Sequence, residues 1–268
     1  MSATDVAFAG SIPGLYDRYM GPMLFEPYAA LMAERARALG PMRILETAAG
    51  TGIVTAAMHA ALPDAEIVAT DLNPAMLDVA ARRVLSDQVS FSPADAQSLP
   101  FADSSFDLVA CQFGVMFYPD KVAANTEARR VLRDGGHYLL AIWDRIDRNL
   151  ATKAAGAAVA ALFPDDSAAF YERIPFRYHD RAAIEGDLRS AGFTAIAFDT
   201  VELRSRAPSA RDAAVGLCQG TPMRAELEKH GPGTLEHATQ IATEALRQFE
   251  DADGFDAAMS AHIVLATK

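Results

Sequence analysis

The stretch ILETAAGTG, residues 44–52, joins a short apolar strand to a loop of small residues. The strand ends at Glu46, and the loop passes through Gly50 and Gly52 into an amphipathic segment, residues 51–62, that is typical of a helix. Small residues let a bulky ligand approach the backbone, and a helix start offers unpaired N–H groups and the positive end of its dipole. The stretch therefore predicts a strand–loop–helix unit that binds a ligand at its loop.

A second acidic residue, Asp71, ends the next expected strand, nineteen residues after Gly52. In a Rossmann-type sheet such a carboxylate reaches the ribose hydroxyls of a nucleoside. Dinucleotide binders need a third glycine after the first two, but here Ile53, Val54 and Thr55 follow. Glu46 would repel a pyrophosphate and suits the ammonium group of a methionine moiety. The pattern indicates an adenosine-containing cofactor.

Strands alternate regularly with helices from residue 42 to residue 143, and the second half of the chain is less regular. Two signals mark helices after the first loop: Asn73 followed by Pro74 reads as an N-cap and first helical residue, and another helix is expected from near Pro119 to about Leu132. Strands separated by such helices favour βαβ units and a parallel sheet. The expected strands are residues 42–46, 66–71, 89–92, 106–112, 137–143, 195–203 and 262–267.

Three motifs together resemble a known family. The pattern E-x-A-x-G-x-G from Glu46 to Gly52 resembles motif I of class I methyltransferases that use S-adenosylmethionine. PADAQSLPFADSSFDLV, residues 93–109, and VLRDGGHYLLAIWD, residues 131–144, resemble segments of the ubiquinone/menaquinone-biosynthesis-like branch. The resemblance is good over residues 42–144 and weaker over 10–41 and 145–204. It implies an α/β fold: a Rossmann-like, doubly wound, seven-stranded sheet, mostly parallel with an antiparallel last strand.

The resemblance also implies an activity and a cofactor site. The activity is in-line transfer of a methyl group from S-adenosylmethionine, with S-adenosylhomocysteine as product, and the apolar run after the fourth strand, residues 112–117, favours a small apolar or aromatic acceptor. The expected organisation is an N-terminal helical lid (residues 1–41), a core (42–204 and 261–268) and a helical cap (205–260) inserted between the sixth and seventh strands. The residues expected to bind the cofactor are Tyr19, Glu46, Thr47, Ala48, Gly50, Gly52, Asp71, Leu72, Met76, Asp95, Ala96, Gln112 and Phe113.

The acceptor side carries weaker signals. Tyr16 of the lid, Phe117 and Tyr118 after the fourth strand, and Gln219 of the cap are candidate substrate contacts. His179, in an irregular segment after the fifth strand, is a candidate general base, although a loop histidine is commonly a surface residue. Ala48 stands where the family often has glycine, and it would be strained if its φ were positive.

The charge and the cysteine content of the chain limit which binding partners are expected. With 35 acidic and 24 basic residues the net charge is −11, which disfavours nucleic acid and anionic membrane surfaces. Two cysteines exclude a disulfide framework, no run of residues suggests membrane insertion or a metal site, and a cytoplasmic monomer or homodimer is expected. Two alternatives stay open: an NAD(P)-dependent oxidoreductase, and a protein that binds S-adenosylmethionine without transferring its methyl group.

Overall fold

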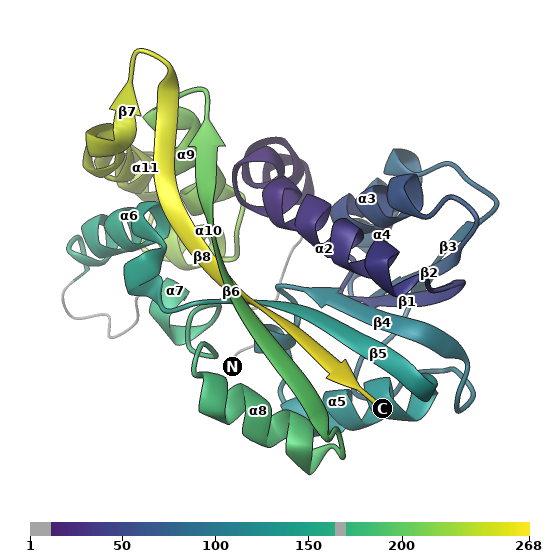
Figure 1. Cartoon of the computed structure of the whole chain (residues 1–268). Helices are drawn as coiled ribbons and strands as arrows, with labels where there is room; N and C mark the ends of the chain where they lie inside the picture. The colour runs from purple at the N-terminus through teal and green to yellow at the C-terminus, as the bar shows by residue number, and fades with distance from the viewer. Residues whose placement is uncertain (1–11, 164–169) are drawn as a thin grey trace. The chain divides into compact units, whose positions relative to one another are not determined.

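The computed structural model describes residues 12–163 and 170–268, and their strands form one sheet in the order β3-β2-β1-β4-β5-β8-β6, with β7 paired to β8 (Figure 1). Strands β1 to β5 pair in parallel, and β8 pairs antiparallel to β5. The predicted mostly parallel Rossmann-like sheet is confirmed. The strands are β1 (Arg43–Thr47), β2 (Glu66–Asp71), β3 (Val89–Pro93), β4 (Phe106–Gln112), β5 (Leu132–Trp143), β6 (Ala195–Ala207), β7 (Glu250–Asp251) and β8 (Gly254–Thr267).

Helices connect the parallel strands, with α3 and α4 on one face of the sheet and α5 and α8 on the other (Figure 1). Asn73, Asp120 and Asp180 begin α4, α5 and α8, and each side chain accepts a hydrogen bond from a backbone N–H of the first turn. The helical segments are α1 (Ile12–Leu15), η2 (Tyr16–Phe25), α2 (Glu26–Leu39), α3 (Ile53–Ala61), α4 (Pro74–Arg83), η3 (Val115–Phe117), α5 (Lys121–Val131), η4 (Ile146–Arg148), α6 (Leu150–Ala160), α7 (Phe170–Arg173), α8 (Arg181–Ser190), α9 (Ala210–Gln219), α10 (Met223–Glu228), α11 (Thr234–Leu246) and η5 (Arg247–Phe249).

The central strands make the core of the sheet. Ile44 and Leu45 of β1 and Leu108 and Val109 of β4 are fully buried. Strands covered by helices on both faces need apolar side chains on both sides, which explains these unbroken apolar runs. Because β1 and β4 lie at the middle of the sheet, the loops that follow them are held by its most rigid part.

The chain divides into two compact units. The sheet unit comprises Tyr28–Trp143, Tyr178–Val201 and Ala261–Lys268, and the helical unit comprises the described parts of Met1–Pro27, Asp144–Arg177 and Glu202–Ser260. In the helical unit α11 packs against α6 and α9, and α9 packs against η2. Residues 1–11 of the expected lid lie outside the described residues, and the expected domain boundaries stay a prediction.

The last strand is longer than the sequence analysis expected. β8 begins at Gly254 rather than at His262, and it forms a hairpin with the two-residue strand β7, so the sheet has an eighth strand. The signal is a period of two, since Phe255, Ala257 and Met259 are buried while the residues between them are less so. The expectation of a helical segment running up to the last strand missed this alternation. Among the described residues, no helix is long and apolar enough to cross a lipid bilayer.

Candidate cofactor site

The β1–α3 loop, residues 48–52, is a tight turn with three residues at positive φ. Ala48, Gly50 and Gly52 have φ of 54°, 56° and 77°. At Gly52 an added Cβ would lie 2.8 Å from Cβ of Ala80 in α4, so both the backbone angle and the helix contact require glycine. At Gly50 the nearest non-neighbouring atom among the described residues would be Cε of Met76, at 3.8 Å. The backbone at Gly50 is thus open to close approach by a ligand.

Ala48 has a positive φ, the condition under which backbone strain was expected at this residue. Its positive φ costs a non-glycine residue about 1 kcal/mol. Its methyl group occupies space left by Gly114, where an added Cβ would lie 2.4 Å from Cβ of Ala48. The loop after β1 and the loop after β4 are therefore packed against each other without a gap.

Glu46 points into the protein at the end of β1. The residue is 2% exposed, and the Thr55 hydroxyl in α3 donates a hydrogen bond of 2.6 Å to its Oε2. Burial raises the pKa of Glu46 to about 8, the Thr55 hydrogen bond opposes the shift, and the nearby Asp71 carboxylate adds to it. A cationic group beside this carboxyl would favour its ionised form.

Asp71 connects the β1–α3 loop to the end of β2. Its Oδ2 accepts from the N–H of Gly50 at 2.9 Å, and its Oδ1 accepts from the N–H of Asn73 at 2.8 Å. Burial raises the pKa of Asp71, while hydrogen bonds from the backbone N–H groups of Asn73, Gly50 and Leu72 oppose that shift. The carboxylate therefore holds the glycine loop at the height of the strand end.

The β3–β4 loop, residues 94–105, carries the expected adenine contacts. The N–H of Ala94 donates to the carbonyl of Asp71 at 3.1 Å, and Asp95 accepts from the N–H of Gln97 at 2.9 Å. Beside it at the end of β2, the Leu72 residue is 68% exposed. Leu72 and Ala94 follow the paired strand ends Asp71 and Pro93, so the exposed leucine lies at the same edge of the sheet as this loop and suits the predicted contact with a planar base.

The fit to the predicted cofactor rests on these features. The open backbone at Gly50 suits close approach of the sugar edge, and the buried carboxyl of Glu46 suits an ammonium group. The Asp71 carboxylate suits ribose hydroxyls, and the exposed Leu72 suits adenine. The structure brings all of these residues together at the carboxyl ends of β1, β2 and β3. These residues therefore fit the predicted cofactor, and their individual roles as its ligands stay predictions.

The residues after β4 are more buried than a substrate-facing loop requires. Phe113 is 6% exposed and has a φ of 54°, and its ring stacks on Trp143 with centroids 3.7 Å apart. The Tyr118 hydroxyl donates to Oγ1 of Thr47 at 3.1 Å and lies 3.4 Å from Sγ of Cys111. Burial raises the pKa of Tyr118 well above its ordinary value, so the hydroxyl stays protonated. Gln112 and Phe117 are half-buried.

Three expected site residues belong to the helical unit. Tyr16 stacks on Phe25 with centroids 4.7 Å apart, and the Arg18 guanidinium lies 5.1 Å from the centroid of Tyr19. Gln219 donates to Oγ1 of Thr239 at 3.1 Å, joining α9 to α11. These contacts account for the three side chains as packing elements of their own unit. Their roles toward cofactor or acceptor stay predictions.

His179 is exposed and lies just before α8 in the sheet unit. Its backbone carbonyl accepts from Nε2 of His262 at 3.1 Å, and Nδ1 of His262 lies 2.8 Å from the Thr200 hydroxyl. These contacts fix the backbone of the segment and do not involve the imidazole of His179. Its role as a general base stays a prediction.

Sequence reasoning missed residues that act on the site from a distance. Thr55, which holds Glu46, lies three residues after Gly52, and a hydroxyl on the first turn of α3 was a usable signal. Glu127 and Arg130 of α5 hold the β3–β4 loop, and their signal was an i,i+3 acid–base pair just before the turn into β5. Neither signal is informative until the fold shows what the side chains face.

The fold and this site define a Rossmann-like protein whose strand-end site fits an adenosine-containing cofactor with a methionine-type tail. A family model described as "Methyltransferase domain" matches residues 45–140. The chain is 39% identical over 110 residues to a demethylmenaquinone methyltransferase of Deinococcus radiodurans, covering 40% of this chain and 46% of that protein. It is 34% identical over 174 residues to a demethylmenaquinone methyltransferase of Clavibacter sepedonicus, covering 60% of this chain and 70% of that protein.

Solved structures share the fold. The phosphoethanolamine N-methyltransferase 2 of Haemonchus contortus, crystallised with phosphomonomethylethanolamine and S-adenosylhomocysteine, matches with a TM-score of 0.63 and 17% identity, over 100% of this chain and 61% of that chain. The chain belongs to the class I S-adenosylmethionine-dependent methyltransferases of the ubiquinone/menaquinone-biosynthesis type. The match spans about half the length of several of the curated relatives.

Proposed function

We propose that this protein transfers the methyl group of S-adenosylmethionine to a small apolar or aromatic acceptor. The observation that carries the proposal is the pair of acids, Glu46 and Asp71, on either side of the open backbone at Gly50. A nicotinamide-dependent oxidoreductase would share Asp71, but the missing third glycine after Gly52 and the carboxyl of Glu46 at the loop, which suits a pyrophosphate poorly, argue against that alternative. Family membership supports the same choice.

The bound cofactor would supply a methyl group carried on a positively charged sulfur. After the methyl group has passed to the acceptor, the rest of the cofactor is neutral S-adenosylhomocysteine. The chain's own residues have the task of positioning and of excluding water. Asp71, held by the N–H of Gly50, would bind the ribose hydroxyls, and ionised Glu46, oriented by Thr55, would balance the ammonium group. Because the leaving group is neutral, no acid is needed to expel it.

An apolar or aromatic acceptor is supported by the similar proteins, two of which are named as demethylmenaquinone methyltransferases. His179 would serve as general base if the acceptor must lose a proton, with Tyr16, Phe117, Tyr118 and Gln219 as the expected acceptor contacts. A cytoplasmic location is proposed with the function, because a chain with two cysteines and no disulfide framework suits a reducing compartment. A monomer or homodimer is proposed as its oligomeric state.

Two measurements test the proposal. Calorimetric titration of the protein with S-adenosylhomocysteine and, separately, with NADH should show binding of the first and not of the second. Formation of S-adenosylhomocysteine from S-adenosylmethionine should then be followed with a panel of quinols, phenols and charged amines as acceptors. Binding of NADH alone would overturn the cofactor assignment, and turnover with charged amines alone would overturn the acceptor class.

A further inference from the structure

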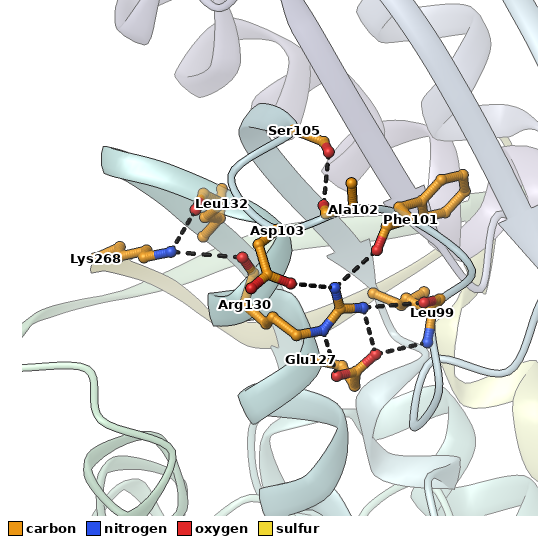
Figure 2. A network of polar contacts seen from close by, with 9 residues as sticks. All are labelled: Leu99, Phe101, Ala102, Asp103, Ser105, Glu127, Arg130, Leu132 and Lys268. Atoms are coloured by element: carbon orange, nitrogen blue, oxygen red, sulfur yellow. Dashed lines mark hydrogen bonds and ion pairs between the residues drawn. The ribbon is translucent and has the colours of Figure 1, made fainter.

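The β3–β4 loop is held by two side chains of α5 (Figure 2). The Arg130 guanidinium donates from Nη1 to the carbonyl of Phe101 at 2.7 Å and from Nη2 to the carbonyl of Leu99 at 3.0 Å. Oε2 of Glu127 accepts from the N–H of Leu99 at 2.8 Å. The N–H and the carbonyl of Leu99, together with the carbonyl of Phe101, are thus fixed by side chains about thirty residues further along the chain.

The two side chains also fix each other. Nε of Arg130 donates to Oε1 of Glu127 at 2.7 Å, and Nη2 donates to Oε2 at 2.8 Å, which makes a bidentate pair. The Arg130 hydrogen bond lowers the pKa of Glu127, so the pair keeps its charges through the neutral range. The pair, here named the α5 clamp, therefore presents its donors and its acceptor in one geometry.

A third partner of Arg130 contributes less. Asp103 accepts from Nη1 at 2.7 Å, but its side chain is 76% exposed, against 29% for Arg130 and 20% for Glu127. Exposed ion pairs are worth little because water and salt screen them. The hold on the loop comes from the two carbonyls and the Leu99 N–H rather than from Asp103.

The other end of the loop reaches the cofactor site. Ala94 bonds to the end of β2, and the Asp95 turn is linked to the start of α5 because the N–H of Asp120 donates to Oε1 of Gln97 at 2.9 Å. Between Asp95 and Leu99 lie three residues, so movement at Leu99 would move the turn. An unclamped loop would sample positions in which Asp95 and Ala96 do not face adenine.

Given the proposed cofactor, we propose that Glu127 and Arg130 are positioning residues that set the affinity for the adenosine part of the cofactor by fixing the β3–β4 loop. Both side chains act on the loop and are not among the residues expected to bind the cofactor. When the binding-competent fraction of a loop falls, the apparent Kd rises by the same factor. A loop that is competent a tenth of the time gives a Kd about tenfold higher.

The experiment uses two ligands. S-Adenosylhomocysteine contains the adenosine and the amino-acid parts, and 5′-methylthioadenosine contains the adenosine part alone. Arg130→Gln and Glu127→Gln should raise the Kd of both ligands by the same factor, about tenfold. Hydrogen exchange should quicken over residues 94–103 and stay slow in β1 and β4. Arg130→Lys keeps the charge but not the fork, so it should fall between the wild-type protein and Arg130→Gln.

Two variants serve as controls. Arg129→Gln removes the same charge from the same helix, but Arg129 donates to the carbonyl of Gly192, away from this loop. Asp103→Asn removes the exposed partner of Arg130. Both should leave the Kd of each ligand within about twofold of wild type, since exposed pairs are worth little.

The outcomes separate the two proposals. If the wild-type protein binds neither ligand, the proposed function fails and the role of the clamp fails with it. If the wild-type protein binds both and the folded clamp variants bind equally well, the clamp inference alone is overturned. A loss confined to S-adenosylhomocysteine would overturn it too, because the loop faces the adenosine part. Should Arg130→Gln not fold, Arg130→Lys and Glu127→Gln carry the same test.

Discussion

The two loops that meet the adenosyl part of the proposed cofactor are built in different ways. The β1–α3 loop is shaped mainly by its own backbone, with Gly50 and Gly52 at positive φ, and two side chains add to this: Asp71 accepts from the N–H of Gly50, and Arg83 of α4 donates to the carbonyl of Thr51. The β3–β4 loop is shaped by side chains of a distant helix, Glu127 and Arg130. A loop fixed by its backbone leaves a local signature in the sequence, whereas a loop fixed from a distance does not.

Gly52→Ala is expected to have the largest effect, because it attacks the backbone-built loop directly. The new methyl group would lie 2.8 Å from Cβ of Ala80 and would sit on a residue with φ of 77°. Overpacking and left-handed strain together should lower the free energy of unfolding by about 2–4 kcal/mol. Urea unfolding followed by circular dichroism measures the loss.

Gly135→Ala is the matched control for that substitution. Gly135 has φ of 76°, and no described non-neighbouring atom lies within 4 Å of an added Cβ. Gly135→Ala should lower the free energy of unfolding by about 1 kcal/mol, the cost of a positive φ alone. Equal losses for the two variants would show that the approach of α3 to α4 does not matter.

This contrast explains how much of the protein could be predicted from its sequence. Glu46, Gly50, Gly52 and Asp71 were found because a strand, a glycine turn and a second strand follow one another closely, and the sheet brings them together as expected. The mostly parallel sheet followed from the same alternation of strands and helices. Local spacing carries this information because the backbone itself makes the structure.

The remainder depends on contacts between distant segments. Arg130 holds the β3–β4 loop through the carbonyls of Leu99 and Phe101, and the residues next to Arg130 in the sequence do not predict those hydrogen bonds. The extra residues at the start of β8 pair with β7 through a hairpin at Gly254, and small residues such as Ala257 fit a helix as well as a strand. Partners of this kind are known only once the chain has folded.

Asp71→Asn is expected to have the next largest effect. The substitution replaces an oxygen acceptor with an NH₂ donor, so the N–H of Gly50 or of Asn73 loses its partner and the ribose loses a charged acceptor. Hydrogen bonds to a charged group are worth about 1.5–3 kcal/mol, which corresponds to a Kd for S-adenosylhomocysteine that is about thirtyfold higher. Asp78→Asn, an exposed change of the same kind in α4, should leave calorimetric binding unchanged.

Glu46→Gln should remove a pH dependence of stability. Because burial raises the pKa of Glu46 to about 8, the folded protein keeps a proton that the unfolded chain releases above its ordinary pKa of 4.5. This contribution to stability is full below about pH 4.5 and is lost as the pH rises toward 8, at up to about 1.4 kcal/mol per pH unit. Between pH 6 and pH 8 the free energy of unfolding should therefore fall by about 2 kcal/mol more in wild type than in Glu46→Gln. Equal pH dependence in the two proteins would show that Glu46 is already ionised at pH 6.

Tyr118→Phe should have the smallest effect, and it probes the contact between the loops after β1 and β4. The phenol donates to Oγ1 of Thr47 and lies beside Sγ of Cys111, and its removal leaves the aromatic packing in place. The free energy of unfolding should fall by about 1 kcal/mol, the net worth of one buried hydrogen bond. The Kd for S-adenosylhomocysteine should stay within about twofold, because the β1–α3 loop is fixed by its backbone and by Asp71 rather than by this side chain. A tenfold loss of affinity would mean instead that Thr47 depends on Tyr118 for its position, and that the β1–α3 loop relies on the loop after β4 as well as on its own backbone and Asp71.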